Sequence, residues 1–355
     1  MKNQMKWFQL SLIFLFILIL AACSGSETTN EGSSSSGSSS NNNSDTNETT
    51  EGDIPEKTFK LAHITPVDHM WHLAAEKFDE ELQARTDGKM KLEIYPASQL
   101  GTEADMVQQV EAGSIDLGFI TAAYLSARTP EMAAWFAPYT FKSLQETYEA
   151  SKSDIAREIL SKVEGTGLKA LDYLFAGQRV MILKEKEIKQ ATDLKGLKMR
   201  VTPSPPLQAF YKAAGAAPEA LPLPEVYSAL QTGVIDGMDM DLDATITNNY
   251  SEVAKYAAVT NHMVWPSIII TNESMYNGMS EEARKVIGEA LEAALIYSIE
   301  TRTSQEEEFK SELTNQGMVV YDLGEEVFAE QIEAFDHEYS SQSEVIKEFI
   351  ETFRK

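Results

Sequence analysis

Arg200 is the residue whose place in the sequence best suits it to bind an anion. It lies in the segment GLKMRV, where Leu197, Met199 and Val201 alternate with two cations. This alternation predicts a strand over 197–201 with its apolar residues on one face and Lys198 and Arg200 on the other. A guanidinium is always charged, and its planar fork matches a carboxylate in two parallel hydrogen bonds. We therefore expect Arg200 to bind a carboxylate; the alternative is an exposed arginine at a strand end.

Three aspartates downstream could bind a cation. Asp239, Asp241 and Asp243 alternate, so in an extended chain their carboxylates would point one way and offer oxygen ligands to a hard ion. The run lacks the glycine and the distal glutamate of a calcium loop. A solvated acidic loop is the alternative.

A group of histidines suggests a zinc receptor as a second function. His63, His69 and His72 are close in sequence, and His69 and His72 could share a helix face. A zinc site needs three or four converging ligands, and His262 could supply the fourth. This metal-binding lipoprotein is the alternative to a carboxylate receptor.

The segments around Arg200 predict a strand–helix–helix–strand unit. After the strand, residues 202–206 break the pattern with prolines, as expected of residues that cannot donate to a sheet. A helix over 207–214 ends at Gly215, and a second helix from about Pro224 ends at Gly233 before a strand over 234–238. Such a unit favours parallel strands, and open α/β sheets bind ligands at the carboxyl ends of their strands. Arg200 would lie at that end.

The rest of the folded chain alternates strand and helix patterns, which implies mostly parallel sheets covered by helices. Pro266 interrupts an otherwise strand-like run and predicts an edge, a bulge or a change of lobe. The predicted strands are 58–64, 90–95, 115–120, 169–174 and 179–184, and the predicted helices are 68–84, 144–163, 245–256, 280–316 and 325–353.

The N-terminus is typical of an exported lipoprotein. Residues 1–22 combine Lys2 and Lys6 with an apolar run too short for a typical membrane span, and Leu20 to Cys23 read as a lipobox. Cys23 is the only cysteine, which suits lipidation better than redox chemistry. Residues 23–56 would form a Ser/Asn-rich disordered tether, and the lipid would anchor the protein at the outer face of the cytoplasmic membrane. An uncleaved signal anchor is the alternative.

The charge of the chain excludes some partners. A formal net charge of −25 argues against binding nucleic acid and against electrostatic adhesion to anionic lipid. An anionic ligand would have to be captured locally, by cations placed in a cleft. Catalysis ranks last, a hydrolase included, because the chain has no G-x-S-x-G, no phosphate-binding Walker loop, no H-E-x-x-H and no catalytic cysteine.

Several motifs together resemble one family. GQRVMILKEKEIKQATDLKGLKMRV, EVYSALQTGVIDG, YPASQLG with QQVEAGSIDLGF, and PEMAAWFAPYTF are similar to the solute-binding proteins of tripartite ATP-independent periplasmic (TRAP) transporters, and we identify a dicarboxylate-receptor type. The resemblance covers nearly all of residues 57–355. It implies an α/β, two-lobed periplasmic-binding-protein-like fold with a mixed sheet in each lobe, hinge strands and a long lobe-bridging helix. Lobe I would comprise 57–177 plus 266–305, and lobe II 178–265 plus 306–355.

The resemblance also implies the function and its residues. In the family, arginines at the positions of Arg200 and Arg179 bind the ligand carboxylate or lie beside it, and the receptor delivers its ligand to a membrane permease. For Arg179 the alternative is a surface charge paired with the acidic excess. Aromatic walls would come from Trp71, Trp265 or Trp135, each of which could equally belong to the core.

Differences from the sialic-acid-binding members argue against sialic acid as the ligand. This chain has Ile120 and Thr121 where those proteins carry an acidic residue. It has Asp239 and Met240 at the last two positions of the motif that reads GQEN in those proteins. We expect a small organic acid instead, namely a dicarboxylate, a keto or hydroxy acid or a uronate. Since some members bind a cation with their acid, Asp239 and Asp241 are candidates for one, and no other cofactor is expected. The predicted ligand-binding residues are Arg200, Arg179, Trp71, Thr121, Met240, Asp239 and Trp265.

Overall fold

The computed structural model describes residues 54–354. The predicted signal peptide, Cys23 and nearly all of the predicted tether lie outside the described residues. Among the helices of residues 54–354, none has the length and apolar character needed to cross a membrane.

One sheet contains strands from both the beginning and the later part of the chain. Its order is β2-β1-β3-β10-β4, with β1 parallel to β2 and β3, and β10 antiparallel to β3 and β4. The register shifts between Val264 and Pro266, so the predicted bulge at this proline is confirmed. The strands are β1 Lys57–Ala62, β2 Met90–Tyr95, β3 Leu117–Thr121, β4 Leu168–Gln178 and β10 Val264–Asn272.

A second mixed sheet holds the unit around Arg200. Its order is β11-β9-β5-β8-β6-β7. Strand β6 runs parallel to β8, as the unit predicted, and also parallel to β7. The sequence missed β7, whose residues APEA are half-buried or exposed and show no apolar alternation. The last strand of the unit begins at Gly237 instead of Val234. The strands are β5 Val180–Leu183, β6 Lys198–Val201, β7 Ala217–Ala220, β8 Gly237–Met240, β9 Tyr256–Val259 and β11 Val319–Asp322.

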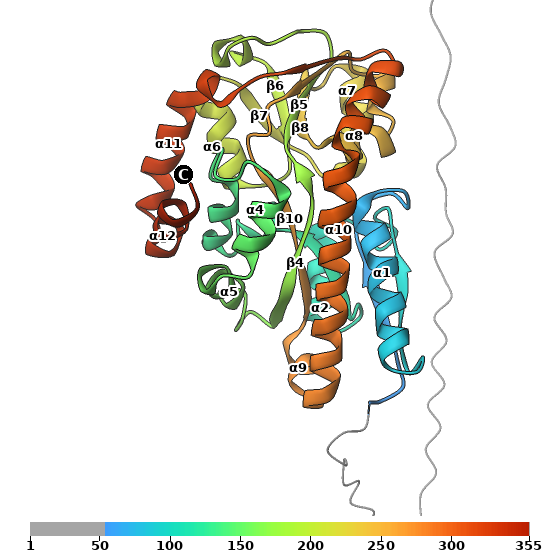
Figure 1. Ribbon diagram of the computed structural model, residues 1–355. Coiled ribbons are helices and arrows are strands. Elements are labelled where there is room, and N and C mark those ends of the chain that lie inside the picture. Colours follow the sequence, from blue (N-terminus) through green and yellow to red (C-terminus); the bar gives the residue numbers. More distant parts are fainter. Residues whose placement is uncertain (1–53, 355) are drawn as a thin grey trace, which may run out of the picture. The chain divides into compact units, whose positions relative to one another are not determined.

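The two sheets form the cores of two lobes, and three segments connect them. The chain passes from β4 to β5 through Arg179 alone, and from β9 to β10 through residues 260–263. The long helix α10, Glu281–Asn315, contacts β4 of one sheet and β11 of the other, and Figure 1 shows it running past both. The predicted bridging helix is therefore confirmed, and Ser280 caps its first turn through a hydrogen bond from the backbone N–H of Ala283.

The other helices cover the sheets. The single helix predicted over 144–163 is wrong, because Ser153 caps a second helix after a turn at Lys152. The helix predicted over 245–256 is also too long, since the chain returns to β9 at Tyr256. The α-helices are α1 Met70–Arg85, α2 Glu103–Glu111, α3 Ala122–Leu125, α4 Leu144–Ser151, α5 Asp154–Ser161, α6 Pro205–Ala213, α7 Val226–Thr232, α8 Leu242–Thr247, α9 Glu273–Asn277, α11 Ala329–Ser340 and α12 Glu344–Phe353. The 3-10 helices are η1 Pro130–Phe136, η2 Ala191–Leu194, η3 Leu223–Glu225, η4 Tyr250–Glu252 and η5 Glu325–Phe328.

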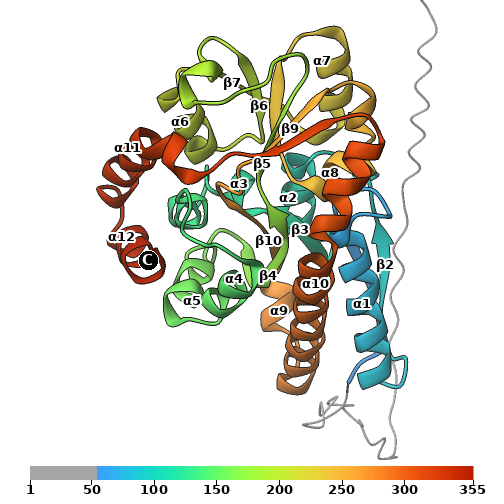
Figure 2. The same ribbon diagram turned by 45° about the horizontal axis from the view of Figure 1, so that its top comes forward.

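The two C-terminal helices pack on different parts of the fold. Helix α11 contacts α6, whereas α12 contacts η1 and α5, and Figure 2 shows the pair on the side away from α1. Trp135 lies in this region, where its ring contacts Tyr173, Phe175 and Phe349. It is a core residue and does not line a ligand cavity with the other predicted tryptophans. The predicted lobe boundaries stay a prediction.

Candidate functional site

Arg200 lies on β6, the second strand from one edge of the second sheet. The guanidinium is buried, with only 2% of the residue exposed, so the alternative of an exposed arginine at a strand end is wrong. Its Nε donates a hydrogen bond to the carbonyl oxygen of Leu221 at 2.9 Å, and none of the ion pairs found within residues 54–354 involves it. Burial lowers the pKa of Arg200 to about 10. The site thus holds a desolvated cation that no carboxylate of the described residues pairs with directly.

Arg179 is buried as well, but it has its own counter-ions. It donates to the carboxylate of Asp239 through Nε and to that of Asp241 through Nη1, the latter at 3.1 Å. Its guanidinium stacks on the ring of Trp265, 3.8 Å from the centroid. Since Arg179 is the single residue between β4 and β5, this ion pair lies at a crossing between the sheets. Arg179 is therefore not the surface charge considered as its alternative.

Asp239 is held by three side chains. Besides Arg179, it accepts hydrogen bonds from the hydroxyl of Tyr211 at 3.0 Å and from Nε2 of His262 at 2.9 Å. Burial acts to raise the pKa of Asp239, but Arg179 and His262 outweigh it, and the pKa lies below the ordinary value. An aspartate already bonded in this way positions Arg179 and has little capacity left for a cation.

A small cavity brings several predicted residues together. Its volume is about 20 Å³, room for about one water molecule. The indole N–H of Trp71 is buried here without a hydrogen-bond acceptor. A buried orphan donor beside a buried cation is suited to an oxyanion. The lining residues are Ile64, Thr65, His69, Trp71, Arg179, Arg200, Thr202, Leu223, Met240, Asp241, Ala244 and Trp265.

A second cavity of about 160 Å³ adjoins the first and shares Ile64 and Leu223 with it. Its one ionisable carboxyl is that of Glu103, at the start of α2, which accepts a hydrogen bond from the backbone N–H of Thr121 at 2.6 Å. Burial raises the pKa of Glu103 to about 7. The remaining walls are Thr102, Ala104, Tyr124, Pro203, Pro222 and Pro224.

The predicted site residues divide between these cavities and the surrounding shell. The smaller cavity is lined by Arg200, Arg179, Trp71, Met240 and Trp265, and also by Asp241. Asp239 lies behind it. Thr121 lines neither cavity; its backbone holds Glu103, and its hydroxyl accepts the N–H of Tyr124 to cap α3. Sequence reasoning missed Glu103, whose only signal was an acid just after the Thr102 helix cap.

The histidines do not assemble the zinc site. Nε2 of His63 and Nδ1 of His72 share a hydrogen bond at 3.1 Å, which leaves no room for an ion between them. His69 instead caps α1 and faces Asp241 and Asp243, with Nε2 to carboxylate distances of 3.8 and 3.7 Å. Within residues 54–354 no three His, Cys, Asp or Glu side chains converge as metal ligands. The prediction that these histidines converge on a zinc ion is therefore wrong.

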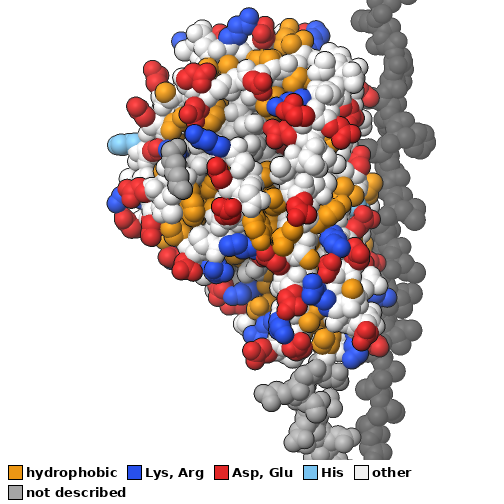
Figure 3. Space-filling view, in the orientation of Figure 1, with side chains coloured by type: hydrophobic (Ala, Val, Ile, Leu, Met, Phe, Trp, Pro, Cys, Tyr) orange, Lys and Arg blue, Asp and Glu red, His pale blue; other side chains and the backbone are white. Residues whose placement is uncertain are grey.

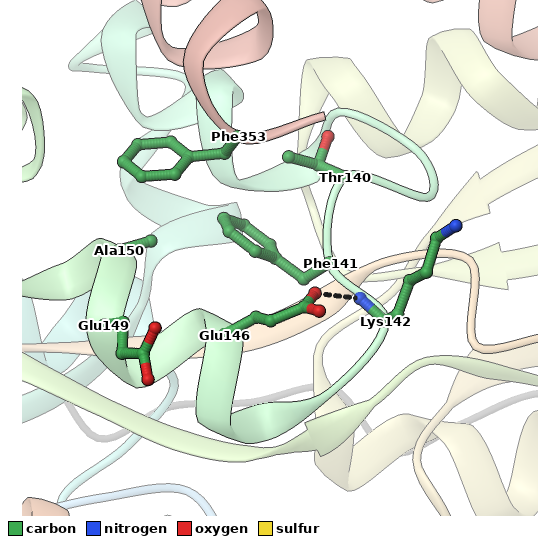
Figure 4. Close-up of a pocket in the computed structure, with 7 residues that line it drawn as sticks. All are labelled: Thr140, Phe141, Lys142, Glu146, Glu149, Ala150 and Phe353. Carbon is green, nitrogen blue, oxygen red and sulfur yellow. Dashed lines mark hydrogen bonds between the residues drawn. The ribbon is translucent and has the colours of Figure 1, made fainter. Parts of the chain in front are cut away.

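A third cavity, of about 270 Å³, lies between α4 and the end of α12 (Figure 4). The carboxylate of Glu146 accepts a hydrogen bond from the backbone N–H of Lys142 at 2.8 Å, and Glu149 and Phe353 line the opposite parts. Its lysine is exposed, and it contains no buried cation. Acidic and basic side chains are also interspersed over the face in Figure 3, so no single-sign field marks another anion site there.

Comparisons with known proteins identify the family and support the fold. The model of the bacterial extracellular solute-binding protein family 7 matches residues 61–345. A solute-binding protein of Roseobacter denitrificans is 31% identical over 299 residues, which cover 84% of this chain and 90% of that protein. The 2,3-diketo-L-gulonate-binding periplasmic protein of Escherichia coli is 28% identical, over 78% of this chain and 84% of its own length. A TRAP periplasmic solute-binding protein of Haemophilus influenzae with bound L-gulonate has a TM-score of 0.78 at 27% identity, covering 83% and 98% of the two chains.

Proposed function

We propose, from the premise that this chain belongs to the bacterial extracellular solute-binding protein family 7, that its interlobe cavities bind a small organic acid through Arg200. Members of the family are extracytoplasmic solute-binding receptors of TRAP transporters and not enzymes. The observation that carries the proposal is a fully buried guanidinium, facing a cavity, with no carboxylate partner in the described chain.

The electrostatics of the two arginines support separate roles. Asp239 and Asp241 already neutralise Arg179, so we assign it to holding Trp265 and the crossing between the sheets in place beside the ligand. Among residues 54–354 the hydrogen-bond partner of Arg200 is the Leu221 carbonyl, which is uncharged, and a ligand carboxylate would supply a negative charge. The orphan N–H of Trp71 would donate to the same anion or to a neighbouring ligand oxygen.

The relatives support an acid as the ligand. The Escherichia coli relative is named for 2,3-diketo-L-gulonate, and the Haemophilus influenzae structure contains L-gulonate. Both ligands are acids with one carboxylate. The smaller cavity has room for about one water molecule, so we propose that the lobes part at Arg179 and residues 260–263 to admit the acid and close around it.

Delivery completes the proposed function. We assign Cys23 as a lipidated residue that holds the receptor at the outer face of the cytoplasmic membrane, with residues 23–56 as the tether between the lipid and the folded part. From there the receptor would deliver its acid to the membrane permease. Metabolic labelling with a palmitate analogue should mark the wild-type protein and leave Cys23→Ala unlabelled. Equal labelling of both would contradict the anchor and leave the binding proposal standing.

Titration calorimetry with L-gulonate, D-gluconate and succinate tests carboxylate binding. Arg200→Lys keeps the charge but loses the fork, and we expect it to weaken the bound acids by at least about tenfold. Arg157→Lys changes an exposed arginine in the same way and should leave affinity unchanged. Binding that is equal in wild type and Arg200→Lys would refute the assignment of Arg200.

A further inference from the structure

The two adjoining cavities differ in the charge that they offer a ligand. Arg200 and Trp71 line the smaller cavity, whereas Glu103 lines the larger one. Ile64 and Leu223 line both cavities and so lie between them. A ligand whose carboxylate binds Arg200 would extend past these residues toward Glu103.

Glu103 is built into the site and is not a surface charge. Only 8% of the residue is exposed, and its Oε1 is fixed by the Thr121 N–H at 2.6 Å. No ion pair found within residues 54–354 includes this carboxyl, although the charge of Arg200 opposes part of the effect of burial on its pKa. The walls around it are mainly apolar, from prolines 203, 222 and 224 and Ala104. In such surroundings a carboxyl accepts a hydroxyl donor readily, and a second anion facing it is strongly disfavoured.

From this arrangement we propose that Glu103 sets specificity, so that the receptor takes acids with one carboxylate and a hydroxyl at the far end and rejects the matching dicarboxylates. The inference rests on the proposed carboxylate site at Arg200 and names the ligand class of that site. It narrows the expected ligands from dicarboxylates, keto or hydroxy acids and uronates to hydroxy monocarboxylates alone. Thr121, predicted as a direct contact, acts here by fixing Glu103.

Matched acids test the proposal, because each pair differs only in whether one end is a hydroxymethyl or a carboxylate group. The pairs are 4-hydroxybutyrate with succinate, 5-hydroxypentanoate with glutarate, and D-gluconate with D-glucarate. Calorimetry at pH 8.5 keeps Glu103 largely ionised, since its pKa is about 7. We expect the wild type to bind the hydroxy member of each bound pair at least about tenfold more tightly.

Glu103→Gln removes the charge and keeps an acceptor for the Thr121 N–H. We expect it to reduce the preference by about tenfold, chiefly through tighter binding of the dicarboxylate. Glu149→Gln removes an equivalent charge from the cavity in Figure 4 and should leave the preference unchanged. Circular dichroism of each variant establishes that it is folded.

The outcomes separate the two proposals. If the wild type binds both members of a pair equally, or prefers the dicarboxylate, the role of Glu103 is overturned and carboxylate binding at Arg200 stands. An unchanged preference in Glu103→Gln also overturns it. If none of the six acids binds the wild type, the carboxylate proposal itself fails, and the inference about Glu103 fails with it.

Discussion

Replacing Arg200 by methionine should abolish acid binding and at the same time stabilise the ligand-free protein. Burial lowers the pKa of this guanidinium from 12.5 to about 10. At about 1.36 kcal/mol per pKa unit, the folded state disfavours the cation by about 3 kcal/mol. Methionine fills a similar volume without a charge. Losing the Nε hydrogen bond to Leu221 costs about 1 kcal/mol, so the net gain in unfolding free energy is about 2 kcal/mol.

The pH dependence of this gain has a defined sign. The folded-state pKa is depressed, so the penalty is fully present wherever both folded and unfolded chains are protonated, which is everywhere below about pH 10. The stabilisation by Arg200→Met should therefore be the same at pH 6 and pH 9. A gain of about 2 kcal/mol corresponds to a rise in Tm of about 4 °C for a chain of this size.

Urea and thermal unfolding, followed by circular dichroism on protein refolded without ligand, measure the effect. Arg157→Met is the control, since that side chain is exposed and its replacement should change stability by less than about 0.5 kcal/mol. Added L-gulonate should raise the Tm of the wild type and not of Arg200→Met. A ligand-free Arg200→Met protein less stable than wild type would refute the reasoning, because the guanidinium would then be neutralised within the protein itself.

Three further predictions test other parts of the structure. Glu103→Gln should stabilise the ligand-free protein by about 3 kcal/mol at pH 8.5 and hardly at pH 4. The reason is that burial raises the pKa of the carboxyl from 4.5 to about 7 and disfavours only its ionised form. Equal urea midpoints of variant and wild type at pH 8.5 would contradict this. Burial depresses the pKa of His63 to about 3. Lowering the pH from 7 to 5 should therefore reduce the unfolding free energy of the wild type by about 2 kcal/mol more than that of His63→Gln. Parallel curves of unfolding free energy against pH for the two proteins would show that His63 is not the group responsible. Gly237→Ala would place a Cβ 2.7 Å from the carbonyl oxygen of Ile182 and should destabilise the folded protein by about 1–3 kcal/mol. In Gly288→Ala, within α10, the new Cβ meets nothing within 4 Å, so this variant should be slightly more stable than wild type. The prediction fails if the calorimetric Tm values of both variants move in the same direction.

Local patterns sufficed for the elements whose sequences agree with their environment. The alternation in GLKMRV predicted β6, and Ser280 with a long helical period predicted α10, because a strand and an amphipathic helix each show their period directly in the chain. Pro266 predicted the bulge in β10 for a similar reason, since a proline cannot donate to the sheet. The resemblance to a family then indicated the two-lobed fold and placed Arg200 and Arg179 near one site.

Residue spacing alone did not reveal the partners of those arginines. Asp239 is 60 residues from Arg179 in the chain, yet it binds that guanidinium because β5 and β8 pair side by side. Glu103 acquires its role from the Thr121 N–H and from prolines of the other lobe, all brought to it by packing. The sequence by itself thus determined the elements and the charged residues they carry. Only the tertiary structure decided which arginine pairs with aspartates and which has no ion pair among residues 54–354, because desolvation and ion pairing depend on contacts between distant segments.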